Sequence, residues 1–498
     1  MKRGIISLAV LCAFSQTAQA TNWLQLENNE PPGSRNTAHF WGFIQPELVH
    51  NEGNAVAGIV APPQLTHYNG QDSINNLVGP DFSHQNAVQV FRARPGVRGI
   101  MPGTDGKINY FLLAELGYNG ITVVKQNPNS FRYAPAITDA TISVNLPATR
   151  LRVGIGRLPL GEEAMQGEPA MNYANLTNVS DQLLNERFVN PYYSGRQEVP
   201  MLGVPSTQVN LNPAYTNAIP ALSLQRACAG GAGIPGPGTY CMGALNDKPV
   251  GAFRDMGIEA YDWIDKGKWE YSYALMVSDG NGLDIANNGN YDISGRIQAS
   301  YIFGGSGAFR QDASAYAWYQ DGRRNYAGTD YSRVREGVGA KYMDHGLRIG
   351  GEYIKAAGMI YYGVIAPFLD VGGAAFEPVD QMMLASSNTA DGYYVDMGYK
   401  FAPKWEADIR YDTLDKLKNS AYDERLVSTV TYGAQYFYSK NLRFLVNYEI
   451  RKASVPNPLS YLQSPVALQA AQRTQLTDAS IIAGSIGNRI DIACTYTF

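Results

Sequence analysis

The last residues of the chain, NRIDIACTYTF at positions 488–498, alternate between two kinds of side chain. Every second position is apolar or aromatic, and these positions are Ile490, Ile492, Cys494, Tyr496 and Phe498. The positions between them are small, polar or charged, namely Arg489, Asp491, Ala493, Thr495 and Thr497. Because successive side chains of a β-strand point to opposite faces, the segment predicts a strand with one face suited to lipid and one suited to water.

The same alternation recurs upstream and is clearest at 404–412. The apolar positions there are Trp405, Ala407, Ile409 and Tyr411, and the charged ones are Lys404, Glu406, Asp408, Arg410 and Asp412. Strong repeats follow at 443–451 and 268–277, and weaker ones at 108–118, 137–146, 150–157, 295–303, 312–320, 337–343, 347–355 and 393–401. Each repeat has roughly the 9 residues that a tilted strand needs to cross a bilayer.

The apolar faces of these segments are rich in Trp and Tyr, which is typical of strands that meet lipid headgroups. A soluble β-sandwich also alternates, but it faces Val, Ile and Leu inward. The pattern therefore predicts an all-β, antiparallel transmembrane barrel of the bacterial outer membrane. The end of the chain, with Phe498 two residues after Tyr496, is similar to the closing strand that the barrel-assembly machinery reads, so outer-membrane lipid and that machinery are the expected partners.

The first twenty residues, MKRGIISLAVLCAFSQTAQA, have the parts of a cleavable signal peptide. Lys2 and Arg3 precede an apolar run that ends near Phe14, and a small-x-small site follows at residues 18–20. The run is too short to cross a bilayer as a helix. We expect residues 1–20 to be removed and residues 21–498 to form a single barrel domain.

Composition gives little reason to expect an enzyme, a cofactor or a nucleic-acid partner. The chain has 33 Tyr and 51 Gly. Its formal net charge is −4, so no basic face for nucleic acid is evident. No C-x-x-C-H haem motif occurs and no nucleophile motif accompanies the histidines. Four of the histidines, His39, His50, His67 and His84, have spacings that match no pair of metal ligands on a helix or hairpin.

The stretches between the alternating segments predict loops. Gly, Pro, Asn and Ser accumulate around 91–100, 127–135, 366–391 and 453–479, which are expected to be extracellular. The longest non-alternating stretch is a loop-rich insertion at 158–249. We expect part of it to fold into the lumen and narrow the pore. Cys228 and Cys241 bracket a Gly/Pro-rich segment within it and are predicted to form a disulfide.

Three segments resemble the phosphate-selective porin family of Gram-negative outer membranes. Residues 392–415, GYYVDMGYKFAPKWEADIRYDTLD, resemble a hairpin of that family with an x-x-P-K-W-x-E turn, and residues 432–452 resemble its penultimate hairpin. Residues 149–165, TRLRVGIGRLPLGEEAM, are similar to the element that leads into its pore-constricting loop. The resemblance implies a barrel of about 16 strands (14–18), a homotrimer, and a basic ladder that guides small anions.

The candidate pore-lining residues are the basic ones on predicted inward faces: Arg150, Arg152, Arg157, Lys341, Arg348, Arg410 and Arg443. Arg150, Arg152 and Arg157 lie just before the expected constriction, where they would attract anionic solutes. They could instead pair with Glu162, Glu163 or Glu168 and tether the loop. Acidic residues share the inward faces, namely Glu352, Glu406, Asp408 and Asp412, and such mixed rows are typical of a general pore.

The sequence thus favours a porin for small hydrophilic solutes or ions, with oxyanions such as phosphate among the possible solutes. One alternative is a structural sheath or docking barrel whose lumen holds a periplasmic or surface redox partner. Another is a channel for hydrophobic solutes, which would need an apolar lumen. The charged inward rows argue against the last.

Overall fold

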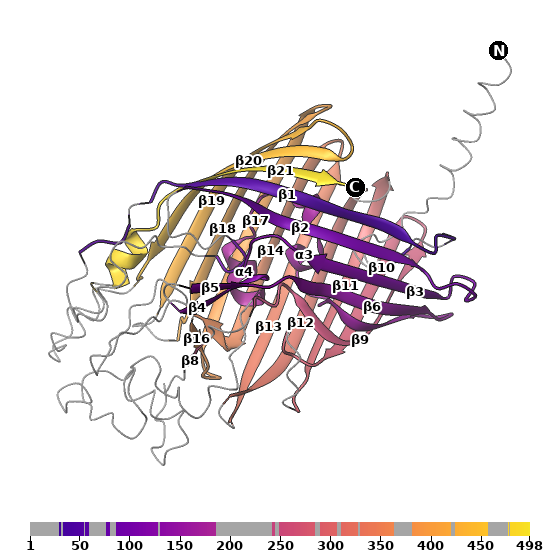
Figure 1. Cartoon of the computed structure of the whole chain (residues 1–498), viewed down its shortest axis with the longest axis horizontal. Helices are drawn as coiled ribbons and strands as arrows, with labels where there is room; N and C mark the ends of the chain where they lie inside the picture. Colours follow the sequence, from indigo (N-terminus) through magenta and orange to yellow (C-terminus); the bar gives the residue numbers. More distant parts are fainter. Residues whose placement is uncertain are drawn as a thin grey trace.

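In the computed structural model, sixteen antiparallel strands close into one barrel (Figure 1). The structure describes residues 29–30, 33–53, 55–58, 76–79, 86–127, 130–185, 242–244, 249–283, 289–305, 310–326, 329–362, 381–419, 424–456, 477 and 479–498. In barrel order the strands are β1 (His39–Asn51), β2 (Asn86–Ile100), β3 (Ile108–Glu115), β6 (Ala136–Asn145), β7 (Arg150–Arg157), β9 (Arg254–Lys266), β10 (Trp269–Ser278), β11 (Asp292–Gly304), β12 (Gln311–Tyr326), β13 (Thr329–Asp344), β14 (Leu347–Gly358), β17 (Thr389–Ala402), β18 (Trp405–Lys416), β19 (Arg425–Phe437), β20 (Leu442–Ser454) and β21 (Arg489–Thr497). The predicted architecture and strand number are confirmed.

The two ends of the barrel differ in the length of their connections. One end carries short turns, such as 267–268 between β9 and β10 and 403–404 between β17 and β18. The start of β1 and the end of β21 lie at this same end. The other end carries the long connections, including 158–253 and 359–388. Short turns face the periplasm in outer-membrane barrels, so the long connections are extracellular.

The first and last strands close the barrel. β1 pairs with β21, and at the periplasmic end the backbone N–H of Gly42 donates to the carbonyl of Phe498 at 3.1 Å. The N–H of Phe498 donates back to the carbonyl of Gly42 at 3.0 Å. A Cβ at position 42 would lie 2.7 Å from the Phe498 ring, so only glycine lets the terminal ring pack there. The seam therefore leaves no free edge.

Alternate residues of each strand are exposed outside or buried inside. In β21 the inward residues Arg489, Asp491 and Thr495 are buried, whereas Ile492 and Tyr496 are exposed. β18 repeats this pattern, with Arg410 and Asp412 among its buried residues. An apolar outer surface around a charged interior is the arrangement of a barrel that spans the outer membrane, and the chain is a multi-pass protein of that membrane.

One predicted loop is wrong. Residues 91–100 belong to β2, which pairs with β1 and β3. Pro95 and Gly96 gave the segment a loop-like composition, but the barrel accommodates both, with Arg92 and Arg94 directed inward. β1 and β9 were not predicted either, because charged and aromatic residues are mixed on their faces. Strand lengths were also underestimated, since β12 and β13, for example, have 16 residues each.

The remaining described elements lie between barrel strands. β4 (Val123–Asn127) and β5 (Ser130–Tyr133) form a hairpin in the β3–β6 connection, and β8 (Met242–Ala244), β16 (Gln381–Met383) and β15 (Ile360–Tyr361) form a small sheet. The short helices α3 (Glu162–Met165), η2 (Glu168–Ala170) and α4 (Asn178–Leu184) follow β7. No described helix is both long and apolar enough to cross a bilayer. Residues 1–20 lie outside the described residues.

Candidate functional site

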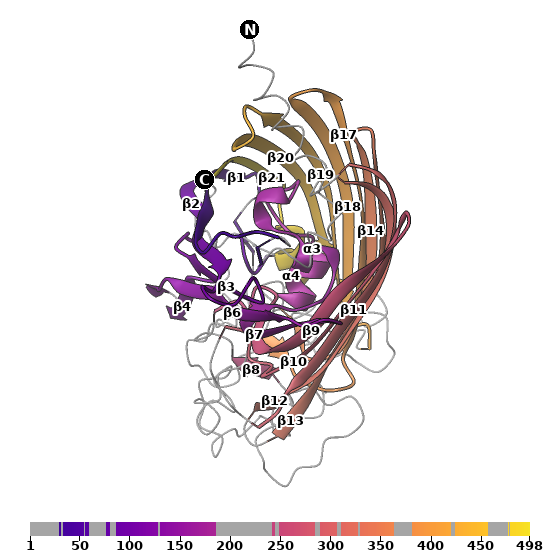
Figure 2. The ribbon, with the colours of Figure 1, turned by 90° about the vertical axis from the view of Figure 1, so that its right-hand side faces the viewer.

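Residues 158–185, hereafter the inner loop, fold into the barrel immediately after β7. Figure 2 shows α3 and α4 enclosed by the ring of strands. The apolar side of the loop packs into a buried cluster with side chains from the wall. The loop contributes Leu158, Leu160, Ala164, Val179, Leu183 and Leu184, and the wall contributes residues that include Tyr316, Trp318, Ile354, Tyr394 and Leu414. Residues 158–185 of the insertion thus lie in the lumen, in agreement with the prediction that part of it enters the pore.

The first turn of α3 is held by charged groups of three strands. Arg296 of β11 and Lys341 of β13 pair with the Glu162 carboxylate at 3.1 and 2.8 Å. Burial opposes ionisation of Glu162, but these two cations outweigh it and lower the pKa of the carboxyl. The backbone N–H of Glu162 donates to the Glu352 carboxylate of β14 at 3.1 Å. This end of the loop is therefore fixed to the wall.

Glu168 of η2 is held on the other side of the lumen. It pairs with Arg157 at 2.8 Å and with Arg94 of β2, and Arg254 of β9 lies 3.7 Å away. Burial alone would raise the pKa of Glu168, but the guanidiniums of Arg157 and Arg94 hold it well below its usual range. The carboxylate is therefore a permanent anchor at neutral pH.

The C-terminal half of the inner loop contacts the wall near the seam. Asn175 donates to Asp491 of β21 at 3.0 Å, and the Asn178 backbone N–H donates to Asp412 of β18 at 2.9 Å. Thr177 caps α4 by accepting from the Ser180 N–H at 3.3 Å. Contacts on opposite sides of the barrel thus stretch the loop across the lumen.

The wall facing the loop has a basic sector and an acidic sector. In the basic sector, Arg92, Arg94, Arg152, Arg157 and Arg254 on β2, β7 and β9 outnumber the buried Asp255 and Glu259. In the acidic sector, Glu352, Asp396, Glu406, Asp408 and Asp412 on β14, β17 and β18 outnumber Arg348, Arg410 and Lys416. These strand groups lie opposite one another in the barrel order.

Within each sector most charges are paired. Arg94 binds Glu115 at 2.6 Å in the basic sector, and Arg348 binds Asp408 at 2.6 Å in the acidic one. Among the described residues, Arg92 contacts Gln45 and the Ala174 carbonyl but no carboxylate within ion-pair distance, and Asp412 accepts hydrogen bonds from the backbone and side-chain amides of Asn178 but forms no ion pair. A transverse field therefore crosses the lumen at the level of the loop.

The predicted pore-lining residues all face the lumen, and each has a partner. Arg150 pairs with Asp262 and stacks on Trp263 with 4.1 Å between its guanidinium carbon and the ring centroid. Arg152 pairs with Glu259 at 2.7 Å. Arg157 binds Glu168 and two loop carbonyls, which is the tethering arrangement that the sequence left open.

The other four predicted residues lie on the far wall. Lys341 binds Glu162, and Arg348 binds Asp396 and Asp408. Arg410 contacts Glu163 at 3.3 Å and the Asn175 carbonyl at 3.0 Å. Arg443 donates to Gln435 at 3.0 Å. The structure therefore divides the set between two walls of the lumen.

Sequence reasoning missed several inward cations, namely Arg92, Arg94, Arg254 and Arg296. In FRARPGVRG, Arg94 lies two residues after Arg92, and Arg98 lies four residues after Arg94. These even spacings place the three side chains on one face of a strand, but the segment 91–100 was interpreted as a loop. Arg254 follows directly on the insertion, where no alternation precedes it.

Two further predictions concern cysteines and metals. Cys228 and Cys241 lie outside the described residues, so the predicted disulfide remains a prediction. Cys494 is a free thiol, half-buried on the outer face. In the part of the chain that the structure describes, no group of three or more His, Cys, Asp or Glu residues is arranged to hold a metal ion.

Comparison with known proteins gives likenesses to solved structures of outer-membrane proteins. No family model and no curated protein matches the chain. The anion-selective porin from Comamonas acidovorans is 13% identical with a TM-score of 0.48, over 93% of this chain and 100% of its own. The outer membrane channel DcaP of Acinetobacter baumannii is 10% identical with a TM-score of 0.48, over 95% of this chain and 100% of its own. The trimer form of OmpT from Vibrio cholerae is 12% identical with a TM-score of 0.46, over 93% of this chain and 100% of its own. The barrel assignment rests on this chain's own strand pairing.

Proposed function

We propose that the protein is an outer-membrane channel for the passive diffusion of small hydrophilic solutes or ions. The observation that carries this proposal is the inner loop, which is anchored across the lumen between a basic and an acidic sector. A loop fixed at both sides narrows a pore without moving during passage, and opposed charges orient polar solutes. No step in this function requires catalysis or a cofactor.

We further propose that the solutes include anions, with oxyanions such as phosphate as one class. The resemblance of 149–165, 392–415 and 432–452 to phosphate-selective porins supports this, as do Arg150 and Arg152 on the inner face of β7. Arg150 is only partly buried, so part of its guanidinium stays available to a passing solute. The balance of charge in the opposed sectors favours weak selectivity over strong exclusion of cations.

The anion proposal predicts a measurable change in selectivity. In the double variant Arg150→Ala with Arg152→Ala, Asp262 and Glu259 lose their partners and the inner face of β7 and β9 becomes acidic. The reversal potential of the reconstituted protein in a salt gradient should shift toward cation preference.

A matched control removes two positive charges from the outer surface. Arg323 and Lys355 are exposed and face away from the lumen, so Arg323→Ala with Lys355→Ala should leave the reversal potential unchanged. An unchanged potential in the Arg150/Arg152 variant as well would remove the proposal that these arginines select anions.

We also propose a homotrimer, assembled through the outer faces of β1, β2, β3, β6 and β7. The exposed residues there are mainly aliphatic, for example Ile44, Leu48, Val88, Leu112 and Ile142. Most of the exposed Tyr and Trp side chains that mark lipid contact lie on β9 to β21 instead. Light scattering of the purified protein should give three chains per particle; a monomer would contradict the proposal.

A further inference from the structure

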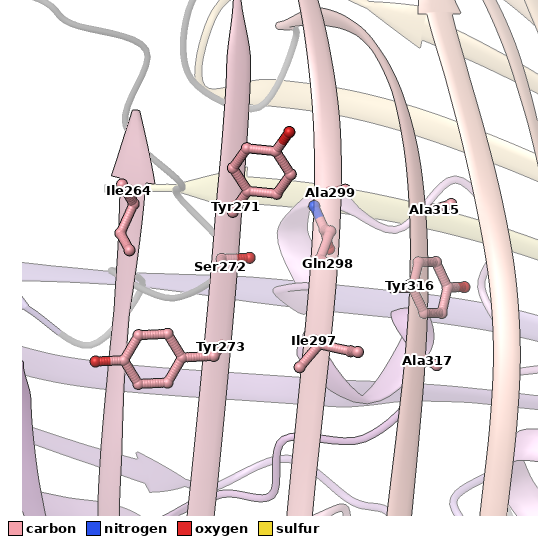
Figure 3. Close-up of a pocket in the computed structure, with 10 residues that line it drawn as sticks. All are labelled: Ile264, Tyr271, Ser272, Tyr273, Ile297, Gln298, Ala299, Ala315, Tyr316 and Ala317. Carbon is pink, nitrogen blue, oxygen red and sulfur yellow. The ribbon is translucent and has the colours of Figure 1, made fainter. Parts of the chain in front are cut away.

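The outer wall of the barrel has an apolar groove of about 550 Å³ across β9 to β12. Figure 3 shows Tyr271 and Tyr273 of β10 beside Ile297 of β11, with Ala315 and Ala317 on β12. Ala299 and Ala315 are register partners, as are Ile297 and Ala317. Because an alanine side chain ends at Cβ, the outer surface is lower at Ala299, Ala315 and Ala317 than at the tyrosine rings beside them.

The groove begins at the periplasmic headgroup level. Below it, outward rings touch one another along the wall: Trp269 and Tyr271 (centroids 6.0 Å apart), Trp269 and Tyr301 (5.1 Å), Tyr301 and Phe303 (5.6 Å), and Phe303 and Tyr342 (5.7 Å). Such a belt of rings marks the boundary between the acyl chains and the headgroups.

The groove covers part of the depth of one leaflet. On β10 its lining runs from Tyr271 to Tyr273, so it rises roughly 7 Å along the strand, or about 5 Å along the membrane normal for a strand tilted by about 40°. The apolar band of an outer-membrane barrel is about 25 Å tall, so half of it is about 12 Å. The groove therefore holds a segment of an acyl chain that enters from the periplasmic leaflet.

Two lysines flank the periplasmic end of the groove. Lys266 and Lys268 border the β9–β10 turn and are exposed, and Lys266 is the register partner of Trp269. The Lys268 Nζ atom lies 5.9 Å from the centroid of Tyr301. The nearby carboxylate of Glu270 points into the barrel, where it binds Arg310 at 2.9 Å. The rim on the lipid side is thus positively charged.

We propose that this groove binds one anionic phospholipid of the periplasmic leaflet, with an acyl chain over Ala299, Ala315 and Ala317 and the phosphate at Lys266 and Lys268. A second copy of the chain is a poorer occupant, because the rings around the groove are those of a lipid-facing wall and the aliphatic surface lies on β1 to β7. The proposal is independent of what passes through the lumen.

Native mass spectrometry of the delipidated full chain in detergent tests the proposal, with palmitoyl-oleoyl phosphatidylglycerol and phosphatidylethanolamine as probes. The wild type should bind one phosphatidylglycerol roughly tenfold more tightly than phosphatidylethanolamine. Lys266→Ser with Lys268→Ser should abolish that preference. Ala315→Phe fills the groove and should weaken binding of both lipids.

The matched controls are Ala434→Phe, at an exposed outward alanine of β19, and Lys440→Ser, in the β19–β20 turn. Both should bind phosphatidylglycerol as the wild type does, and heat-modifiable gel mobility shows that every variant is folded. Equal binding by Ala315→Phe and the wild type would overturn the proposal, as would equal affinity of the wild type for the two lipids. Loss of self-association in Ala315→Phe without loss of lipid binding would assign the groove to a second copy instead.

Discussion

Among single residues, Glu352 is an anchor of the inner loop with several hydrogen-bond donors. Its buried carboxylate accepts hydrogen bonds from Trp318 Nε1 at 2.6 Å, from the Tyr394 hydroxyl at 3.0 Å and from the Glu162 backbone N–H at 3.1 Å. Three donors from two strands and the loop therefore converge on one acceptor. Arg296, Lys341 and Arg410 join the wall to α3 as well, through the carboxylates of Glu162 and Glu163.

Glu352→Ala should remove the contact between the start of the loop and β14 while the Glu162 ion pairs to Arg296 and Lys341 remain. Each buried donor that loses its acceptor costs about 1–3 kcal/mol, so the free energy of unfolding should fall by at least that amount. Urea titration of the protein in lipid vesicles measures this. The control Glu336→Ala removes an exposed carboxylate that pairs with Lys355 at 3.4 Å, and it should change the free energy by less than about 1 kcal/mol. Equal losses in the two variants would mean that Glu352 is not an anchor.

Alternation alone predicted which side chains face the lumen, but not their partners. Arg150 and Arg152 were placed inward correctly, because a strand's two faces follow from its period. Their partners Asp262 and Glu259 lie on β9, a strand that the sequence did not reveal. Partners across the barrel depend on register and closure, which no local pattern encodes.

At the scale of elements, α4 is fixed by a carboxylate outside the spanning strands. Asp181 accepts from the Leu77 backbone N–H at 2.5 Å and from Asn185 at 3.1 Å. Burial raises the pKa of Asp181 to about 6 against these hydrogen bonds. The folded protein therefore holds this proton to a higher pH than the unfolded chain does.

The sign of the pH effect follows from that difference. The stabilising contribution of the protonated Asp181 is complete below the unfolded pKa of about 4 and is lost as the pH rises through the folded value of about 6. Asp181→Asn cannot ionise, so the free energy of unfolding of the wild type should fall relative to this variant between pH 4 and 7. Asp105→Asn, in an exposed periplasmic turn, should give a profile parallel to that of the wild type. A parallel profile for Asp181→Asn would contradict the account.

The closing strand gives a second prediction at this scale. Phe498 completes the seam with Gly42, and we propose that the assembly machinery reads it. Phe498→Ala should lower the folded fraction in outer-membrane preparations, measured by heat-modifiable mobility on gels. Phe444→Ala removes an exposed ring of the neighbouring β20 and should have little effect. Equal folded fractions for Phe498→Ala and Phe444→Ala would contradict the proposal that the assembly machinery reads Phe498.

Elements were predictable where one face was uniformly apolar. β10 and β21 were predicted almost to their ends, and β18 and β20 over most of their length, because Trp, Tyr, Ile and Val occupy most outward positions. β2 was not, because Pro95 and Gly96 interrupt its pattern. The inner loop was predicted to enter the lumen, but α3 and α4 were not predicted, since helices this short depend on tertiary contacts.

At the scale of the whole molecule, the barrel reverses the usual arrangement of a soluble protein. Its outer surface is apolar, and its interior holds ion pairs and a small apolar cluster around the inner loop. Lipid replaces water around the barrel, so the apolar outer face needs no covering layer of protein. The backbone N–H and C=O groups of the strands form hydrogen bonds with neighbouring strands of the closed sheet. The charged interior is what makes a path for polar solutes possible.

As a channel, the protein must conduct small hydrophilic solutes through its lumen past the anchored loop. Single-channel recording of the purified protein in a planar bilayer tests it most directly. We expect discrete current steps in the wild type and larger steps in Glu352→Ala, in which the loop loses its contact with β14. A correctly folded barrel that carries no current in either form would contradict the claim and would favour a sheath whose lumen is filled.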